Sequence, residues 1–207
     1  MILNDICVFD FETSGLDHQN DRVIELAAIR VRNGEIVGQF QTLIHQPIEL
    51  PEKITEITGI TPELMRSGMD EDLAFKILRV LMRDALLVAH NAEFDLQFLH
   101  WTMMRLAGKT FTNSFIDTMT ISRERHPFPH RLEPMCERYG IKLEGAHRAF
   151  NDVIGCFELL KAFHAEKPVD EWVNRLGFLS KYPPPLWVPD YAVTFPTENR
   201  YERREAI

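Results

Sequence analysis

The sequence predicts an α/β fold in which helices cover the faces of a mixed sheet. Two observations predict it: three β-rich segments stand at the start of the chain, and helical and extended segments alternate after them. The chain has 207 residues, which is enough for one domain with a sizeable core and an appendage. We see no internal repeat.

The first three segments are predicted to form an antiparallel meander. The strands are expected at 6–11, 23–31 and 35–44. Side chains two residues apart on a strand point to the same side, so Asp10 and Glu12 share one face of the first strand. The dipeptide Asn33-Gly34 between the second and third strands is a strong hairpin signal.

Apolar residues at helical spacing predict the helices that follow. Helices are expected at 70–83, 93–106, 132–139 and 149–163, with one more beginning at Pro62 and another running through 121. Short apolar strands are expected at 85–89 and 114–116. Proline suits the first position of a helix, and Gly140 suits the end of the helix before it.

The composition changes near Ala165. From there to the last residue come six of the twelve prolines and two of the three tryptophans. The run 183–185 is Pro-Pro-Pro, which favours an extended polyproline stretch. So many aromatic residues are unusual for a plain disordered tail. We therefore expect residues 1–165 to form the main domain and residues 166–207 to be an extension that packs on it or on a partner.

Charge and cysteine usage narrow the classes of function. The formal net charge of −8 argues against a sequence-independent coat for duplex DNA, since such proteins are usually basic. A nuclease stays possible, because bound metal ions offset a cluster of carboxylates. The three cysteines lack CxxC spacing, so we expect reduced thiols. We expect no signal peptide, no membrane association and a cytoplasmic location.

Acidic residues at three places suggest a metal site. Asp10 and Glu12 can share metal ions, although such a pair can also be a solvated strand end. Asp95 begins a helix after the strand at 85–89, where sites in such folds gather, although it can also serve the helix dipole. Taken singly, each of these acids therefore has an explanation that involves no metal.

His147 and Asp152 lie across the start of the last strong helix. A neutral histidine beside a metal-bound water can take its proton, although a lone histidine is more often a surface residue. Together with the other three acids, these residues supply what two divalent ions and a general base need to cut a phosphodiester bond.

The ordered set closely resembles the three motifs of the DEDDh branch of the DnaQ-like 3′–5′ exonucleases. That family includes the proofreading subunits and domains of bacterial replicative polymerases, ribonuclease T and oligoribonuclease. The matching segments are FDFETSGL, HNAEFD and HRAFND. The resemblance covers residues 5–163.

The resemblance implies a ribonuclease H-like fold with a five-stranded mixed sheet. It also implies two Mg²⁺ or Mn²⁺ ions held by Asp10, Glu12, Asp95 and Asp152. His147 would be the general base, and the product would be a nucleoside 5′-monophosphate released from a 3′ end.

Further positions match residues of the family's terminal-nucleotide pocket. These predicted substrate-binding residues are Thr13, Leu16, His90, Asn91 and Phe94. For Leu16 and Phe94 the alternative is ordinary core packing. Asp117 matches a recurring family aspartate that we interpret as structural.

Substrate and partner are less defined by the sequence. The loop 58–61 resembles one found in proofreading exonucleases and favours single-stranded or frayed DNA 3′ ends. Ribonuclease activity of the same family is the alternative, because sequence does not locate contacts to the 2′-hydroxyl. A scaffolding role is a third hypothesis, in which a polymerase or another protein docks on residues 166–207.

Overall fold

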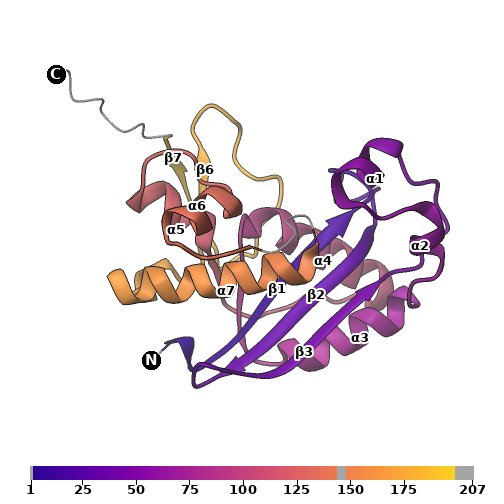
Figure 1. Ribbon diagram of the computed structural model, residues 1–207, viewed down its shortest axis with the longest axis horizontal. Helices are drawn as coiled ribbons and strands as arrows, with labels where there is room; N and C mark the ends of the chain where they lie inside the picture. The colour runs from indigo at the N-terminus through magenta and orange to yellow at the C-terminus, as the bar shows by residue number, and fades with distance from the viewer. Residues whose placement is uncertain (1, 144–147, 199–207) are drawn as a thin grey trace.

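A five-stranded mixed sheet organises the protein, in the spatial order β3-β2-β1-β4-β5. The computed structural model describes residues 2–143 and 148–198. Strands β1, β2 and β3 form an antiparallel meander (Figure 1). Strand β4 pairs in parallel with β1, and β5 pairs in parallel with β4. This order confirms the predicted mixed sheet.

The strands of the main sheet are β1 (Asp5–Thr13), β2 (Val23–Arg32), β3 (Glu35–Leu43), β4 (Leu86–Ala89) and β5 (Phe115–Asp117). The helices are α1 (Glu52–Thr58), α2 (Pro62–Arg66), α3 (Glu71–Met82), α4 (Ala92–Ala107), α5 (Thr118–Arg125), α6 (Leu132–Arg138) and α7 (Ala149–Glu166). The extension holds β6 (Arg175–Leu179) and β7 (Val193–Thr197), and short 3-10 helices lie at η1 (Ile2–Asn4) and η2 (Asp170–Trp172).

The turn between β2 and β3 follows the residues that build it. Asn33 and Gly34 both have positive φ, at 53° and 84°. A two-residue hairpin turn of this hand suits the twist of its strands, and asparagine and glycine adopt it most readily. The predicted hairpin is therefore confirmed.

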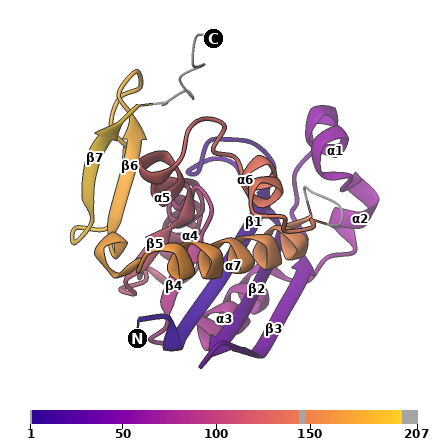
Figure 2. The same cartoon turned by 60° about the vertical axis from the view of Figure 1, so that its left-hand side comes forward.

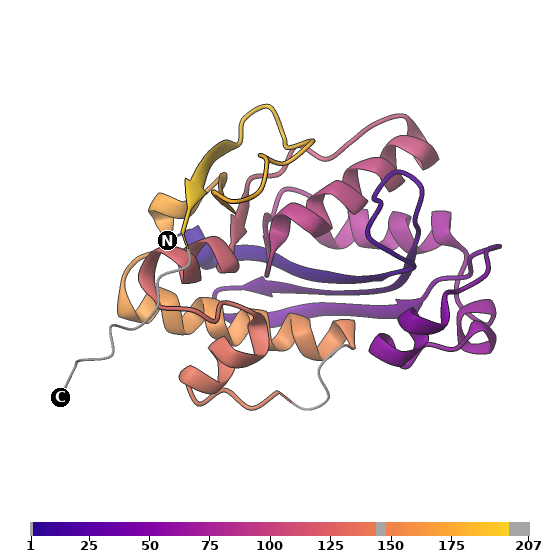
Figure 3. The same ribbon diagram turned by 90° about the horizontal axis from the view of Figure 1, so that it is seen from above.

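Helices cover both faces of the sheet. Figure 3 shows α3, α4 and the extension on one side of the sheet, with α6 and α7 on the other. Alternate residues of β1 serve the two sides: Phe9 and Phe11 pack in the cluster with α3 and α4, whereas Ile6 and Val8 pack in the cluster with α7. By the same alternation, Asp10 and Glu12 face α7.

Two helices differ from the sequence expectation. Helix α1 was not expected, because its seven residues carry no apolar stripe long enough to predict a helix. Gly59 ends it with a φ of 71°, a conformation that glycine adopts readily. Helix α7 ends at Glu166 and not at residue 163.

The described part of the extension packs on the main domain. Strands β6 and β7 pair in parallel and stand beside α5 (Figure 2). The backbone amide of Phe115 donates to Asn174 Oδ1 at 2.9 Å, and the amide of Asn174 donates back to the Phe115 carbonyl at 2.8 Å. Gly177 adds a bond from its amide to Thr120 Oγ1 at 2.9 Å. These bonds join the extension to β5 and α5.

Two further observations concern the sequence expectations. Cys7, Cys136 and Cys156 are free and buried, in agreement with the predicted thiols. Within residues 2–143 and 148–198, we find no helix with the length and apolar character that a membrane crossing requires.

The extension is predicted to contribute to stability. Leu176 is buried in the cluster with α3 and α4, so Leu176→Ala should lower the free energy of unfolding by about 2–5 kcal/mol. For a chain of this size that corresponds to a melting temperature lower by roughly 5–15 °C. Thermal unfolding followed by circular dichroism measures the change, with the exposed Val193→Ala as control. Equal melting temperatures for both variants would contradict the packing role.

Candidate active site

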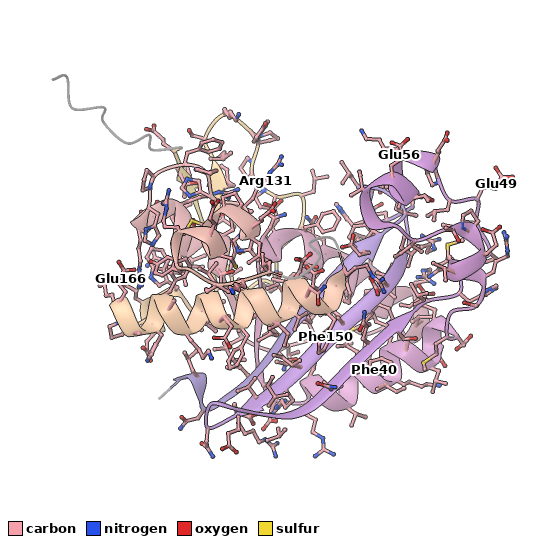
Figure 4. All side chains as sticks on the ribbon, viewed as in Figure 1. Phe40, Glu49, Glu56, Arg131, Phe150 and Glu166 are labelled. Atoms are coloured by element: carbon pink, nitrogen blue, oxygen red, sulfur yellow. The ribbon has the colours of Figure 1, made fainter. Side chains whose placement is uncertain are left out.

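Three carboxylates meet where α7 begins over the sheet. Asp10 and Glu12 come from β1, and Asp152 comes from the first turn of α7. One carboxylate oxygen from each lies within 4.8 Å of the others. Glu166, labelled in Figure 4, marks the opposite end of α7. The structure therefore brings residues 142 positions apart into one cluster.

Asp95 joins the site through the backbone of β1. It is buried in the first turn of α4, and its Oδ1 accepts a hydrogen bond from the amide of Phe11 at 3.1 Å. Phe11 is the residue between Asp10 and Glu12. The fourth acid thus lies beside the strand that carries the first two, although it is not one of the three whose oxygens lie within 4.8 Å.

The site is strongly negative. Burial, followed by the charges of Asp152 and Glu25, raises the pKa of Glu12 to about 7, while Arg148 acts in the opposite direction. Burial also raises the pKa of Asp10 well above its usual range, and the charge of Asp95 adds to the effect. Crowded carboxylate oxygens of this kind suit hard divalent cations such as Mg²⁺ or Mn²⁺. The donor set therefore fits the metals that the sequence predicts.

His147, the predicted general base, lies outside the described residues. Its neighbour Arg148 is the N-cap residue of α7, four positions before Asp152. The assignment of His147 stays a prediction from the sequence.

The predicted pocket residues of the first motif lie at the end of β1 and just after it. Thr13 is buried, and its hydroxyl donates to the Gly15 carbonyl at 2.6 Å. Leu16 is 82% exposed, so the alternative of core packing is wrong for this residue. Phe94 lies partly buried against Phe98, with ring centroids 4.9 Å apart, so it also packs on the core.

His90 and Asn91 lie at the turn from β4 into α4. Asn91 has a φ of 72°, and its amide donates to Asp117 Oδ1 at 2.9 Å. The two ring nitrogens of His90 contact Thr118 Oγ1 at 2.8 Å and the His130 carbonyl at 2.9 Å. Burial lowers the pKa of His90 to about 4, so the ring is neutral. The predicted contacts of both residues with substrate stay predictions.

The family follows from comparison with known proteins. Residues 7–160 match the model of the exonuclease family RNase_T. The chain belongs to this exonuclease family. The predictions of an exonuclease and of a ribonuclease H-like fold are confirmed, as is the resemblance to the proofreading exonucleases of bacterial DNA polymerase III.

Similar sequences occur within much longer proteins. One is the PolC-type DNA polymerase III of Clostridium perfringens, 36% identical over 156 residues, and another is that of Bacillus cereus, 40% identical over 149 residues. These matches cover 74% and 70% of this chain but 11% and 10% of the polymerases. The chain therefore spans about a tenth of their length.

Similar folds occur in exonuclease I. The E. coli enzyme in complex with a dA16 oligonucleotide has a TM-score of 0.72 at 21% identity, over 80% of this chain and 42% of that chain. Exonuclease I from Methylocaldum szegediense has a TM-score of 0.70 at 20% identity, over 79% of this chain and 41% of its own. At this level of identity the likeness shows the shared fold.

Glu25 is a site residue that the sequence reasoning missed. It is fully buried on β2, directly opposite Glu12. Arg148 Nη2 donates to Glu25 Oε1 at 3.0 Å, and the amide of Ala149 donates to Oε2 at 3.4 Å. Gln41 Nε2 donates to Oε1 at 2.9 Å. Glu25 thereby ties the first turn of α7 to the sheet in this exonuclease. The sequence feature that could have indicated this role is a charged residue inside the apolar run VIELAAI.

Asp117 has the structural role that its sequence position suggested. Its carboxylate accepts from the amides of Met119 and Thr120 at the start of α5. It also accepts from the amides of Asn91 and Ala92 at the start of α4. One buried side chain therefore fixes the helix that carries Asp95.

The acidic cluster predicts a stability that depends on pH and metal. The pKa of Glu12 is about 7 in the folded state and about 4.5 in the unfolded chain. The folded state therefore binds more protons between these values, and without metal the melting temperature should rise as the pH falls from 8 towards 5. Saturating Mg²⁺ or Mn²⁺ should raise the melting temperature at pH 8 and raise it less at pH 6.

Thermal melts with and without EDTA measure this effect. Asp10→Asn removes one buried charge, so we expect a higher melting temperature without metal and a smaller response to metal. If divalent ions leave the melting temperature of the natural chain unchanged at pH 8, the metal site at the acidic cluster is ruled out.

The pair of Arg148 and Glu25 predicts a moderate energetic contribution. Arg148→Ala leaves a buried carboxylate without its cation, but Arg148 is half exposed. We therefore expect a loss of about 1–2 kcal/mol, below the full cost of breaking a buried pair. Urea unfolding measures this loss in the free energy of unfolding. Arg66→Ala breaks the exposed pair with Glu63 and should cost about 0–1 kcal/mol, so equal losses would contradict the assignment.

Proposed function

We propose that this chain is a metal-dependent 3′–5′ exonuclease that releases nucleoside 5′-monophosphates from the 3′ ends of DNA. The observation that carries the proposal is the cluster of Asp10, Glu12 and Asp152, with Asp95 beside β1. Crowded carboxylates with raised pKa values, as at Asp10 and Glu12, are typical of catalytic sites.

The four acids would hold two Mg²⁺ or Mn²⁺ ions. When bound, such a pair supplies a nucleophilic water at neutral pH and positive charge for the attacking and leaving oxygens. Asp10, Glu12 and Asp152 face the same space from β1 and α7, and Asp95 lies beside β1 at the amide of Phe11. In this proposal His147 accepts the proton of the attacking water, since imidazole titrates near neutral pH.

The proposed substrate is a single-stranded or frayed DNA end. The similar polymerases are DNA polymerases, and a related fold was solved in complex with the oligonucleotide dA16. These are properties of the relatives, and they support DNA for this chain. We also propose a role in DNA replication or repair in the cytoplasm, with residues 1–165 carrying catalysis and residues 166–207 offering a surface to a polymerase or another protein.

Asp10→Ala tests the proposed reaction. A 5′-labelled DNA oligonucleotide should be shortened stepwise from its 3′ end with Mg²⁺ or Mn²⁺, and the variant should fall to background because it lacks a carboxylate of the cluster. The matched control is Glu56→Ala, which removes an exposed acid of α1 that is not part of the cluster and should keep full activity (Figure 4).

Two outcomes would contradict the proposal. One is unchanged trimming by the Asp10→Ala variant. The other is immediate release of the labelled 5′ nucleotide, which indicates the opposite direction. A matched RNA oligonucleotide measured alongside tests the preference for DNA, which fails if RNA is degraded faster.

A further inference from the structure

A groove of about 340 Å³ is built from three distant segments of the chain. Leu16 and His18 supply the loop after β1, residues 91–97 supply the first turns of α4, and residues 182–186 supply the proline run of the extension. In Figure 3 the extension and α4 lie on the same side of the sheet. The family match ends at residue 160, so the third wall belongs to this chain's own extension.

The groove is lined by residues that neighbour the acids along the chain. Phe94 lines the groove and is the immediate neighbour of Asp95, and Asn91 lies four residues before it. Leu16 follows the end of β1, whose residues Asp10 and Glu12 form the cluster. A chain that places a phosphodiester at the acids would therefore have its adjacent nucleotides beside this groove.

The walls carry large apolar side chains that stay open to solvent. Leu16 is 82% exposed, Tyr182 is 58% exposed and Leu186 is 87% exposed. Lys181 Nζ stands 4.9 Å from the centre of the Tyr182 ring, so a cation accompanies the aromatic face. Aromatic rings beside positive charge are the usual means of holding single-stranded nucleic acid, because every base has a stacking face.

The third wall is fixed to the domain. Trp187 stacks on His100 of α4 with ring centroids 3.8 Å apart, and it meets the edge of Phe111. At the other end of the run, the amide of Tyr182 donates to the Leu179 carbonyl at 2.9 Å. Three successive prolines between these anchors restrict the backbone further. The wall is therefore in place before a ligand arrives, which lowers the entropic cost of binding.

We infer that residues 182–186 are a substrate-binding element, with the Tyr182 ring stacking on a base of the single-stranded 3′ end across from Leu16. The inference rests on the proposed function and gives the extension a role in binding the single-stranded substrate. Lys181 faces the phosphate backbone of the same strand. The occupant is a single strand, since the groove lies at the start of α4, the helix that carries Asp95, and combines stacking surfaces with a cation.

Tyr182→Ala tests the inference. Trimming of a 5′-labelled dT oligonucleotide gives KM and kcat, and fluorescence anisotropy with Ca²⁺ in place of Mg²⁺ gives Kd for the intact strand. We expect KM and Kd to rise about fivefold or more, as for loss of a base-stacking ring, with kcat changed less than about twofold. Tyr182→Phe keeps the ring and should keep both constants.

Two controls separate binding from folding. Val193→Ala changes an exposed residue of the same extension outside the groove and should leave KM and Kd unchanged. Leu186→Ser removes another exposed apolar side chain of the wall and should raise KM even if Tyr182→Ala proves unstable in a thermal melt.

The outcomes distinguish the inference from the proposed function. If the natural chain trims DNA and Asp10→Ala does not, but both wall variants bind and trim as the natural chain does, the inference is overturned and the proposed function stands. If the natural chain trims no nucleic acid, the proposed function fails. Weaker oligonucleotide binding by the wall variants would still support the groove in that case.

Discussion

Asp10 and Asp152 lie 142 residues apart, yet the fold holds their carboxylate oxygens within 4.8 Å of each other and of Glu12. Like charges at this distance repel, and burial increases the cost because water no longer screens them. The raised pKa values of Asp10 and Glu12 record that cost. The rest of the structure has to keep β1 and α7 together against this repulsion.

Two other buried carboxylates, Asp117 and Glu25, hold in place the helices that carry Asp95 and Asp152. Asp117 accepts four backbone amides at the starts of α4 and α5, and so fixes the helix of Asp95. Glu25 receives Arg148 and the amide of Ala149, and so fixes the start of α7. Neither needs a metal for this task. The cluster of Asp10, Glu12 and Asp152 crowds carboxylate oxygens together, which divalent cations suit.

The sequence predicts those features that depend on local spacing. Alternation along β1 was enough to place Asp10 and Glu12 on one face, and Asn33-Gly34 was enough for the hairpin. The role of Glu25 was not predictable in this way. It depends on the strand register that sets Glu25 opposite Glu12. It also depends on the hydrogen bond from Arg148, which lies 123 positions later in the chain. The groove was missed for the same reason, because Tyr182 meets Leu16 only in the folded chain.

The most direct test of the central claim is a crystal structure with Mn²⁺ and a nucleoside 5′-monophosphate, measured at a wavelength where manganese scatters anomalously. Two anomalous peaks are expected about 3.5–4 Å apart. Oxygens of Asp10, Glu12, Asp95 and Asp152 should be their protein ligands. A well-diffracting crystal with bound nucleotide but no manganese at these carboxylates, or with manganese elsewhere, would contradict it.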